Sequence, residues 1–159
     1  MQVHLYDTEI EWIGEKKGQA TAGEFPPLEI ATPPEFQGHE GIWTPEHVLV
    51  ASVNSCLMTT FLAVAEMSKL DFVAFRSQAQ GKLEKVEGQG FQITEVVLRP
   101  HITISHERDR ERVERVLEKA EKNCFISNSI KAEVRLEPTF SVSGVDPRMN
   151  ANEQEGENS

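Results

Sequence analysis

The most extended apolar pattern in the chain runs from Thr44 to Leu70. Thr44 suits an N-cap, and Pro45 suits the first helical position, where its missing N–H is not needed. Glu46 places a carboxylate in the first turn, where the helix dipole favours negative charge. Charged residues are almost absent beyond this start, and apolar side chains point in every direction around the helical wheel. The pattern predicts a long helix that is buried on nearly all sides and forms the centre of the fold.

Alternating apolar and polar positions predict strands on both sides of this helix. Before it, short alternating patterns at 3–13 and 19–25 flank a glycine-bracketed turn, and another short strand is expected at 28–30. After it, alternation over 75–84 and an apolar return segment at 91–104 predict a long antiparallel hairpin. The sequence therefore predicts strands both before and after one central helix.

Two irregularities are expected in the second strand of the long hairpin. Its apolar parity changes between Ile93 and Val96, which predicts a β-bulge. Pro100 lacks an N–H for the sheet ladder and is best tolerated near an edge.

A second helix is predicted to begin at 105–107, with charged residues along one side and an apolar stripe that Cys124 continues. A last strand is expected at 132–136, with Phe140 and Val142 beyond it. These elements predict an α+β fold with antiparallel sheets, a long buried central helix and a second helix.

Length and charge narrow the class of protein. The 159 residues favour one domain, predicted at 1–143, followed by an acidic polar tail at 144–159 that we expect to be disordered. The net charge of −10 argues against nucleic acid and anionic membranes as partners. We expect neither a signal peptide nor a segment apolar enough for long enough to span a bilayer. A cytoplasmic location, with both cysteines reduced, follows from these expectations.

The chain has two cysteines, Cys56 and Cys124, and both are expected on core-facing surfaces. A cysteine on an apolar helix is most often a small buried hydrophobe. Polar residues gather around Cys56 in the helix, although Ser and Thr can also bond back to their own helix carbonyls. The pair favours a redox reading, because one thiolate can attack a peroxide to give a sulfenic acid and a second cysteine can then close a disulfide. Cys56 lies too far along its helix for the dipole to lower its pKa, so a cation from elsewhere is expected.

Other chemistry has less support in the sequence. No Cys or His spacing typical of a metal site occurs, and a zinc site made by Cys56, Cys124 and His47 is the only metal alternative worth naming. Neither a phosphate-binding loop, a dinucleotide fingerprint nor a G-x-S-x-G motif is present. We therefore expect no metal and no cofactor.

Two motifs together resemble the OsmC/Ohr family of osmotically inducible and organic hydroperoxide resistance proteins. The first is Thr44-Pro45-Glu46 followed ten residues later by Cys56, and the second is the segment 123–128, Asn-Cys-Phe-Ile-Ser-Asn. The similarity runs from about Val3 to Phe140. It implies an OsmC-like fold in which two intertwined subunits form a homodimer, with the central helices in the middle and an active site at each end of the interface.

The resemblance also implies roles for particular residues. Cys56 resembles the peroxidatic cysteine and Cys124 the resolving one, while Glu46 matches a carboxylate that pairs with an arginine holding the thiolate. That arginine lies in the first hairpin turn, where this chain carries Lys16 and Lys17 instead. Lysine supplies charge but lacks the planar fork of arginine.

The function implied is a thiol-dependent peroxidase for organic hydroperoxides, in which Lys16 or Lys17 with Glu46 stabilises the Cys56 thiolate and an external dithiol reduces the disulfide. Two alternatives remain open. The first is a non-catalytic protein of the same fold that binds a small apolar or reactive ligand and has sensory or structural cysteines. The second is a hydrolytic or detoxifying enzyme that uses Cys56 as a covalent nucleophile and does not need Cys124.

Overall fold

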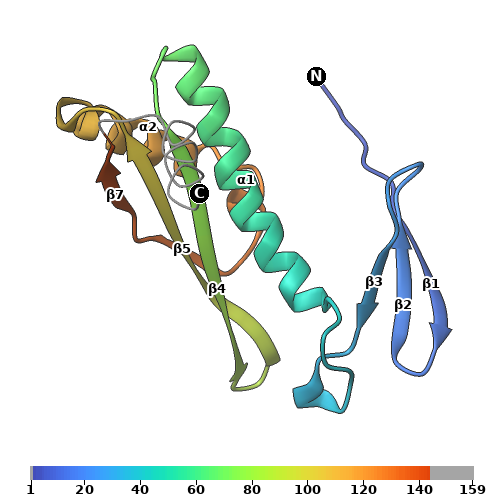
Figure 1. The fold of residues 1–159 in the computed structure, drawn as a ribbon. Coiled ribbons are helices and arrows are strands. Elements are labelled where there is room, and N and C mark those ends of the chain that lie inside the picture. Colours follow the sequence, from blue (N-terminus) through green and yellow to red (C-terminus); the bar gives the residue numbers. More distant parts are fainter. Residues whose placement is uncertain (1, 144–159) are drawn as a thin grey trace, which may run out of the picture. The chain divides into compact units, whose positions relative to one another are not determined.

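The computed structural model describes residues 2–143. They form two compact units, one ending at Leu49 and the other beginning at Val50 (Figure 1). The predicted extent of a single domain, 1–143, stays a prediction, and the predicted acidic tail at 144–159 lies outside the described residues.

The N-terminal unit holds a three-stranded antiparallel sheet in the order β1-β2-β3. Its strands are β1 (Glu9–Gly14), β2 (Lys17–Thr21) and β3 (Leu28–Ala31). The predicted hairpin and the following short strand are confirmed. The first strand is shorter than expected, because 3–8 lie outside it, and the return strand ends at Thr21 rather than at residue 25.

One face of this sheet is apolar. The register aligns Ile10 with Ala20 and Leu28, and it aligns Trp12 with Gly18 and Ile30, so all six side-chain positions lie on the same face. Trp12 is 75% exposed and Ile10 is also largely exposed. One chain therefore leaves part of this apolar face open to solvent.

Helix α1 (Pro45–Met67) begins where the sequence predicts. The backbone N–H of His47 donates to Thr44 Oγ1 at 3.1 Å, and the same oxygen lies 2.8 Å from Nδ1 of His47. Thr44 is buried at this position. These contacts confirm the expected N-cap and give His47 a capping role.

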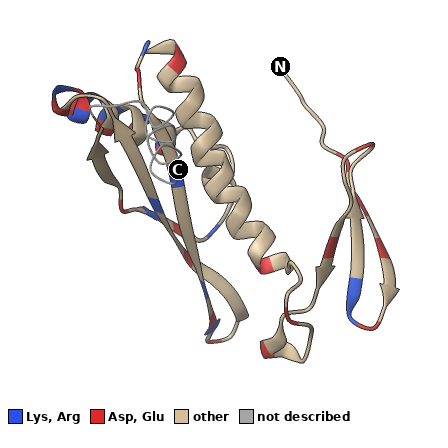
Figure 2. Ribbon diagram, in the orientation of Figure 1, with Lys and Arg blue, Asp and Glu red and all other residues tan. Residues whose placement is uncertain are grey.

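Within one chain only one face of α1 is buried. That face carries Val53, Leu57, Phe61, Val64 and Ala65. The exposed side of the helix also carries apolar side chains, with Leu62 at 41% and Met58 at 38%. Figure 2 shows how few charged residues the helix carries. A helix that is apolar on both faces and covered on one leaves a second surface to be covered.

The expectation that no segment is long and apolar enough to span a bilayer is wrong, as judged by length and composition only. Helix α1 is 23 residues long and apolar enough to cross a membrane. The core helix of a soluble protein passes the same test. The side of α1 that carries Phe61 packs into the core of the C-terminal unit, as expected for the core helix of a soluble protein.

The C-terminal unit is built on a sheet with β5 at its centre. Strands β4 (Ala74–Val86) and β5 (Gly90–Ile104) form the predicted antiparallel hairpin. The predicted bulge is confirmed, because the register shifts between Lys82 and Leu83 and leaves Thr94 as the extra residue on β5. The short strands β6 (Glu133–Leu136) and β7 (Thr139–Val142) pair with β5 in parallel, so the sheet is mixed.

The position of Pro100 differs from the expectation. It lies in the central strand and is fully buried. Strand β6 pairs with β5 as far as Leu98, and β7 resumes the pairing at His101. Pro100 therefore lies opposite the break between β6 and β7, where a missing N–H breaks no ladder bond.

The second helix, α2 (Arg110–Lys122), begins later than predicted, after a 3-10 turn at Glu107–Asp109. Side chains of α1, β5 and α2 share one hydrophobic core. Phe61 lies at its centre, with its ring centroid 5.2 Å from that of Phe72 and 5.1 Å from that of Phe75. Both helices therefore contribute to the same core.

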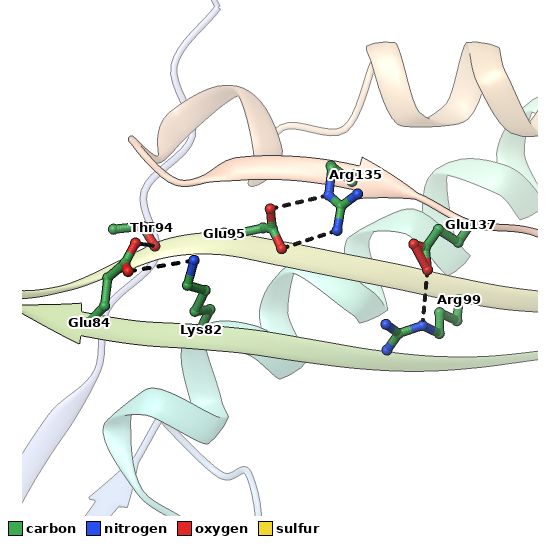
Figure 3. A network of polar contacts seen from close by, with 7 residues as sticks. All are labelled: Lys82, Glu84, Thr94, Glu95, Arg99, Arg135 and Glu137. Atoms are coloured by element: carbon green, nitrogen blue, oxygen red, sulfur yellow. Dashed lines mark hydrogen bonds and ion pairs between the residues drawn. The ribbon is translucent and has the colours of Figure 1, made fainter.

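The other face of the sheet is polar. Figure 3 shows a network of polar contacts on this face, in which Lys82 contacts Glu84 on the same strand, Arg135 contacts Glu95, and Arg99 contacts Glu137. The Thr94 hydroxyl also donates to Glu84 at 2.6 Å. Such exposed pairs add little stability individually. They mark this face as solvent-facing.

A tight contact between α1 and β4 allows a direct test of the core. A Cβ added to Gly81 would clash with Cγ2 of Val50. We expect Gly81→Ala to lower the free energy of unfolding by about 1–3 kcal/mol through overpacking. Urea denaturation measures this loss, and adding Val50→Ala should recover part of it. A neutral Gly81→Ala would contradict the packing described.

Candidate active site

The structure brings Cys56 and Cys124 together inside the C-terminal unit. The two thiols lie close enough to interact, and the interaction lowers the pKa of Cys56 and raises that of Cys124. Both cysteines are free, and they come from the middle of α1 and from the segment just after α2. Cys56 is partly exposed, whereas Cys124 is fully buried. The pair thus joins a reachable thiol to a protected one.

The chain after α2 folds back into a compact turn over residues 124–129, which we call the 124–129 turn. The N–H of Asn128 donates to the carbonyl of Cys124 at 3.1 Å, and the N–H of Ser129 donates to that of Ile126 at 3.0 Å. The Ser129 hydroxyl donates to the carbonyl of Phe125 at 2.6 Å. These bonds hold the carbonyls of Cys124, Phe125 and Ile126 and so order the turn.

The environment of Cys56 lowers the pKa of its thiol. Burial by itself raises this pKa, but hydrogen bonds to the sulfur from the Cys124 thiol, the Ile126 N–H, the Thr60 hydroxyl and the Phe125 N–H together outweigh it. The Thr60 oxygen lies 3.8 Å from the sulfur. Donors that bond to the charged form stabilise a thiolate, so these contacts favour ionisation of Cys56.

The pKa of Cys124 shifts in the opposite direction. Burial raises it, and the bond to Cys56 raises it further, because Cys124 must keep its proton to donate. The hydroxyl and N–H of Ser127 act the other way but do not reverse the shift. The Ser127 hydroxyl is buried and makes no other hydrogen bond among residues 2–143. At a common pH, Cys56 is therefore the more ionised of the two.

The polar residues around Cys56 in the sequence divide into two groups. Thr60 contacts the sulfur. The hydroxyls of Ser55 and Thr59 instead donate to the helix carbonyls of Ser52 and Cys56, and Asn54 donates to the Ser77 carbonyl on β4 at 3.0 Å. Thr60 therefore contacts the thiol, whereas Asn54, Ser55 and Thr59 bond elsewhere.

The other predicted site residues, Lys16, Lys17 and Glu46, belong to the N-terminal unit. The ammonium group of Lys16 donates to the carbonyl of Gln37 at 3.0 Å, and that of Lys17 lies 3.3 Å from Glu15. One oxygen of Glu46 is buried without a hydrogen-bond partner in the part of the chain that the structure describes. Their role at Cys56 stays a prediction.

Sequence reasoning expected a cation near Cys56, whereas the donors that the C-terminal unit supplies are uncharged. It did not find Phe125 and Ile126 as donors. Their contribution comes from backbone N–H groups, which every residue except proline carries, so no residue type could signal it. Across residues 2–143 no group of three or more His, Cys, Asp or Glu could hold a metal ion.

A family model and a relative match most of the chain. The family model for OsmC-like protein matches residues 38–139. The uncharacterized protein YmaD of Bacillus subtilis (strain 168) is 26% identical over 116 residues, which cover 71% of this chain and 77% of YmaD.

Solved structures agree on the fold. The OsmC-like protein VCA0330 of Vibrio cholerae, of unknown function, superposes with a TM-score of 0.78 at 23% identity and covers 86% of this chain and 99% of its own. An organic hydroperoxide resistance protein OsmC from Legionella pneumophila superposes with a TM-score of 0.71 at 23% identity, covering 89% and 100%. The family model spans more than half of the sequence, and the chain belongs to the OsmC-like protein family.

Proposed function

We propose that this chain is a thiol-dependent peroxidase that reduces organic hydroperoxides in defence against oxidative stress. The observation that carries the proposal is the contact between Cys56 and Cys124, in which the exposed sulfur has a lowered pKa and the buried one a raised pKa. Similar folds include organic hydroperoxide resistance proteins, which supports a stress-related redox role.

In the first step the Cys56 thiolate attacks the terminal oxygen of the hydroperoxide. The O–O bond breaks, an S–O bond forms, and the alkoxide leaves as the alcohol after taking a proton. Cys56 becomes a sulfenic acid and is oxidised by two electrons, while the peroxide is reduced to the alcohol. The donors around the sulfur favour the thiolate that this step needs.

In the second step Cys124 loses its proton and attacks the sulfur of the Cys56 sulfenic acid. An S–S bond forms, the S–O bond breaks, and water leaves. The interaction between the two thiols supports their pairing in this step. An external dithiol then reduces the disulfide by thiol–disulfide exchange, and no bound cofactor takes part.

Apolar surface near Cys56 fits an alkyl hydroperoxide. Phe125, which follows Cys124 in the chain and contributes to the lowered pKa of Cys56, is 80% exposed. Apolar side chains around a reactive thiol favour a substrate with an apolar body over hydrogen peroxide.

The assembly we propose is an intertwined homodimer. Each chain exposes an apolar face of α1, which includes Leu62, and an apolar sheet face in its N-terminal unit, which includes Trp12. A second copy supplies matching surfaces for both. Glu46 precedes Cys56 by ten residues, or about 15 Å along the helix axis, so a role for Glu46 with Lys16 or Lys17 at the thiolate requires the partner subunit.

The proposed location is the cytoplasm, where disulfides persist only as steps of a reaction. Nucleic acid and membrane surfaces are not among the proposed partners, because the chain carries a net charge of −10.

The test of this function is consumption of cumene hydroperoxide by the purified protein with a dithiol reductant. We expect multiple turnovers per chain, together with loss of both free thiols when peroxide is added without reductant. If peroxide is not consumed and both thiols still titrate as reduced, the peroxidase proposal is wrong.

A further inference from the structure

We propose that the polar face of the C-terminal sheet carries a binding site for a phosphate group, formed by Arg76 on β4 and Arg99 on β5. This face is opposite to the one that packs against the hydrophobic core. The site is therefore separate from the cysteine pair, and the inference does not depend on the proposed peroxidase.

A groove on this face provides the space for a ligand. Its volume of about 610 Å³ lies within the range of small-molecule sites, about 300–1,000 Å³. The side chains that line it come from neighbouring strands and include two arginines. Arg76 and Gln78 come from β4, Arg99 and His101 from β5, and Glu137 and Thr139 from the segment that leads from β6 into β7.

The register of the β4–β5 hairpin sets the spacing of the two arginines. Arg76 pairs with His101, and Gln78 pairs with Arg99. All four alternate with core-facing positions such as Ile102, so they share the polar face. Arg76 and Arg99 are then diagonal neighbours, which lie about 7–8 Å apart and within reach of long side chains. Two guanidinium groups at this spacing can converge on one group between them.

The positive charge of the arginines is only partly neutralised. Figure 3 shows Arg99 directed at Glu137, and Nε of Arg99 lies 3.2 Å from Oε1 of that carboxylate. The side chain of Arg76 has no hydrogen bond or ion pair within residues 2–143. The groove thus has two guanidinium groups and one carboxylate, in a chain whose net charge is −10. Like charges on neighbouring strands repel each other, so an anion between the arginines is favoured.

Hydroxyl groups around His101 order the far edge of the groove. Nδ1 of His101 lies 2.7 Å from Oγ1 of Thr139, and Nε2 lies 3.0 Å from Oγ of Ser141. The Ser141 oxygen also lies 3.0 Å from Oγ1 of Thr103. These contacts hold β7 against β5 and engage both ring nitrogens of His101. The arginines are therefore the groups that bind the anion.

A phosphate group matches two guanidinium groups better than a carboxylate does. Guanidinium binds phosphate oxygens through parallel N–H groups, often two at a time. A phosphate monoester carries a charge of about −1.5 to −2 at pH 7 and offers three acceptor oxygens. It can therefore contact both arginines at once, whereas a carboxylate brings one charge and two oxygens.

The experiment is isothermal titration calorimetry of the full chain with inorganic phosphate, methyl phosphate and acetate at constant ionic strength. We expect both phosphates to bind and acetate to bind about tenfold more weakly. Tighter binding of methyl phosphate than of inorganic phosphate would assign the site to a phosphorylated molecule, and equal binding would assign it to free phosphate. Either result supports a phosphate site.

Two substitutions should change the affinity in opposite directions. Arg76→Gln should weaken phosphate binding about tenfold, because it removes hydrogen bonds from a charged donor. Glu137→Gln should tighten it, because Arg99 then loses its competing carboxylate. The matched control is Lys85→Gln, which removes one positive charge from the same strand outside the groove and should change the affinity less than about twofold.

Four results would overturn the proposal. They are no binding of either phosphate, equal binding of acetate, equal weakening by Lys85→Gln and Arg76→Gln, and weaker binding by Glu137→Gln. The second and third would indicate a response to the overall charge of the chain instead of a site at Arg76 and Arg99.

Discussion

Cys56→Ser is expected to reduce the consumption of cumene hydroperoxide to the background rate, while Cys124→Ser should reduce about one equivalent of peroxide per chain and then stop. The serine hydroxyl at position 56 is not an adequate nucleophile toward a peroxide. The loss should be on the order of 10³-fold or more. In Cys124→Ser the sulfenic acid forms at Cys56 and finds no second thiol in reach.

The measurement is peroxide consumed in the absence of reductant, combined with trapping of the sulfenic acid by dimedone and mass spectrometry. Dimedone should label Cys56 in Cys124→Ser and label little in the parent, where the disulfide forms instead. The matched control is Ser55→Ala, one position before Cys56, because Ser55 is exposed and donates only to a helix carbonyl. Parent-like repeated turnover by Cys124→Ser would rule out a resolving role for Cys124.

Leu62→Glu is expected to prevent formation of the homodimer. Leu62 lies on the exposed apolar face of α1, which we propose a second copy covers. An isolated carboxylate buried in an apolar interface has no partner to offset its desolvation, which costs several kcal/mol. Light scattering coupled to size-exclusion chromatography should report the mass of two chains for the parent and of one chain, or of unfolded material, for the variant.

Gln80→Glu is the matched control for that experiment. It makes the same change in charge on β4, at an exposed position on the strand that carries the polar network. It should leave the mass of the parent unchanged. A parent protein that is monomeric at micromolar concentration, or a Leu62→Glu variant that remains a stable dimer, contradicts the proposed assembly.

Local patterns predicted most of the elements. The N-cap at Thr44 and the bulge at Thr94 depend on residues close in sequence, and both are visible as breaks in a periodic pattern. The parallel pairing of β6 and β7 with β5 was not predictable in the same way, because it depends on contacts between distant segments. Pro100 suggested an edge strand, where its missing N–H would cost no ladder bond. In the structure Pro100 lies in the central strand, opposite the gap between β6 and β7, and the missing N–H costs no ladder bond there either.

The candidate site likewise has one part that the sequence predicts and one part that it does not. The sequence singled out Cys56 and Cys124 as a pair, because a two-thiol reaction needs residues of that type. It did not show which groups would lower the pKa of Cys56, since two of the four are peptide N–H groups and a third is the other cysteine. Sequence indicates side-chain chemistry, whereas the direction of a backbone N–H depends on how a turn folds.

The contact between the two sulfurs also bears on the chain before it has folded. Residues 57–123, with the whole β4–β5 hairpin and helix α2, separate the cysteines along the sequence. The 124–129 turn reaches Cys56 only after these elements have packed, so the lowered pKa is a property of the native state alone. A nascent or denatured chain carries two ordinary thiols, with pKa values of about 8.5 and little thiolate at neutral pH. If Cys56 reacts with peroxide as proposed, we expect this reactivity to be acquired at the end of folding, so that the chain is spared from oxidation during its synthesis.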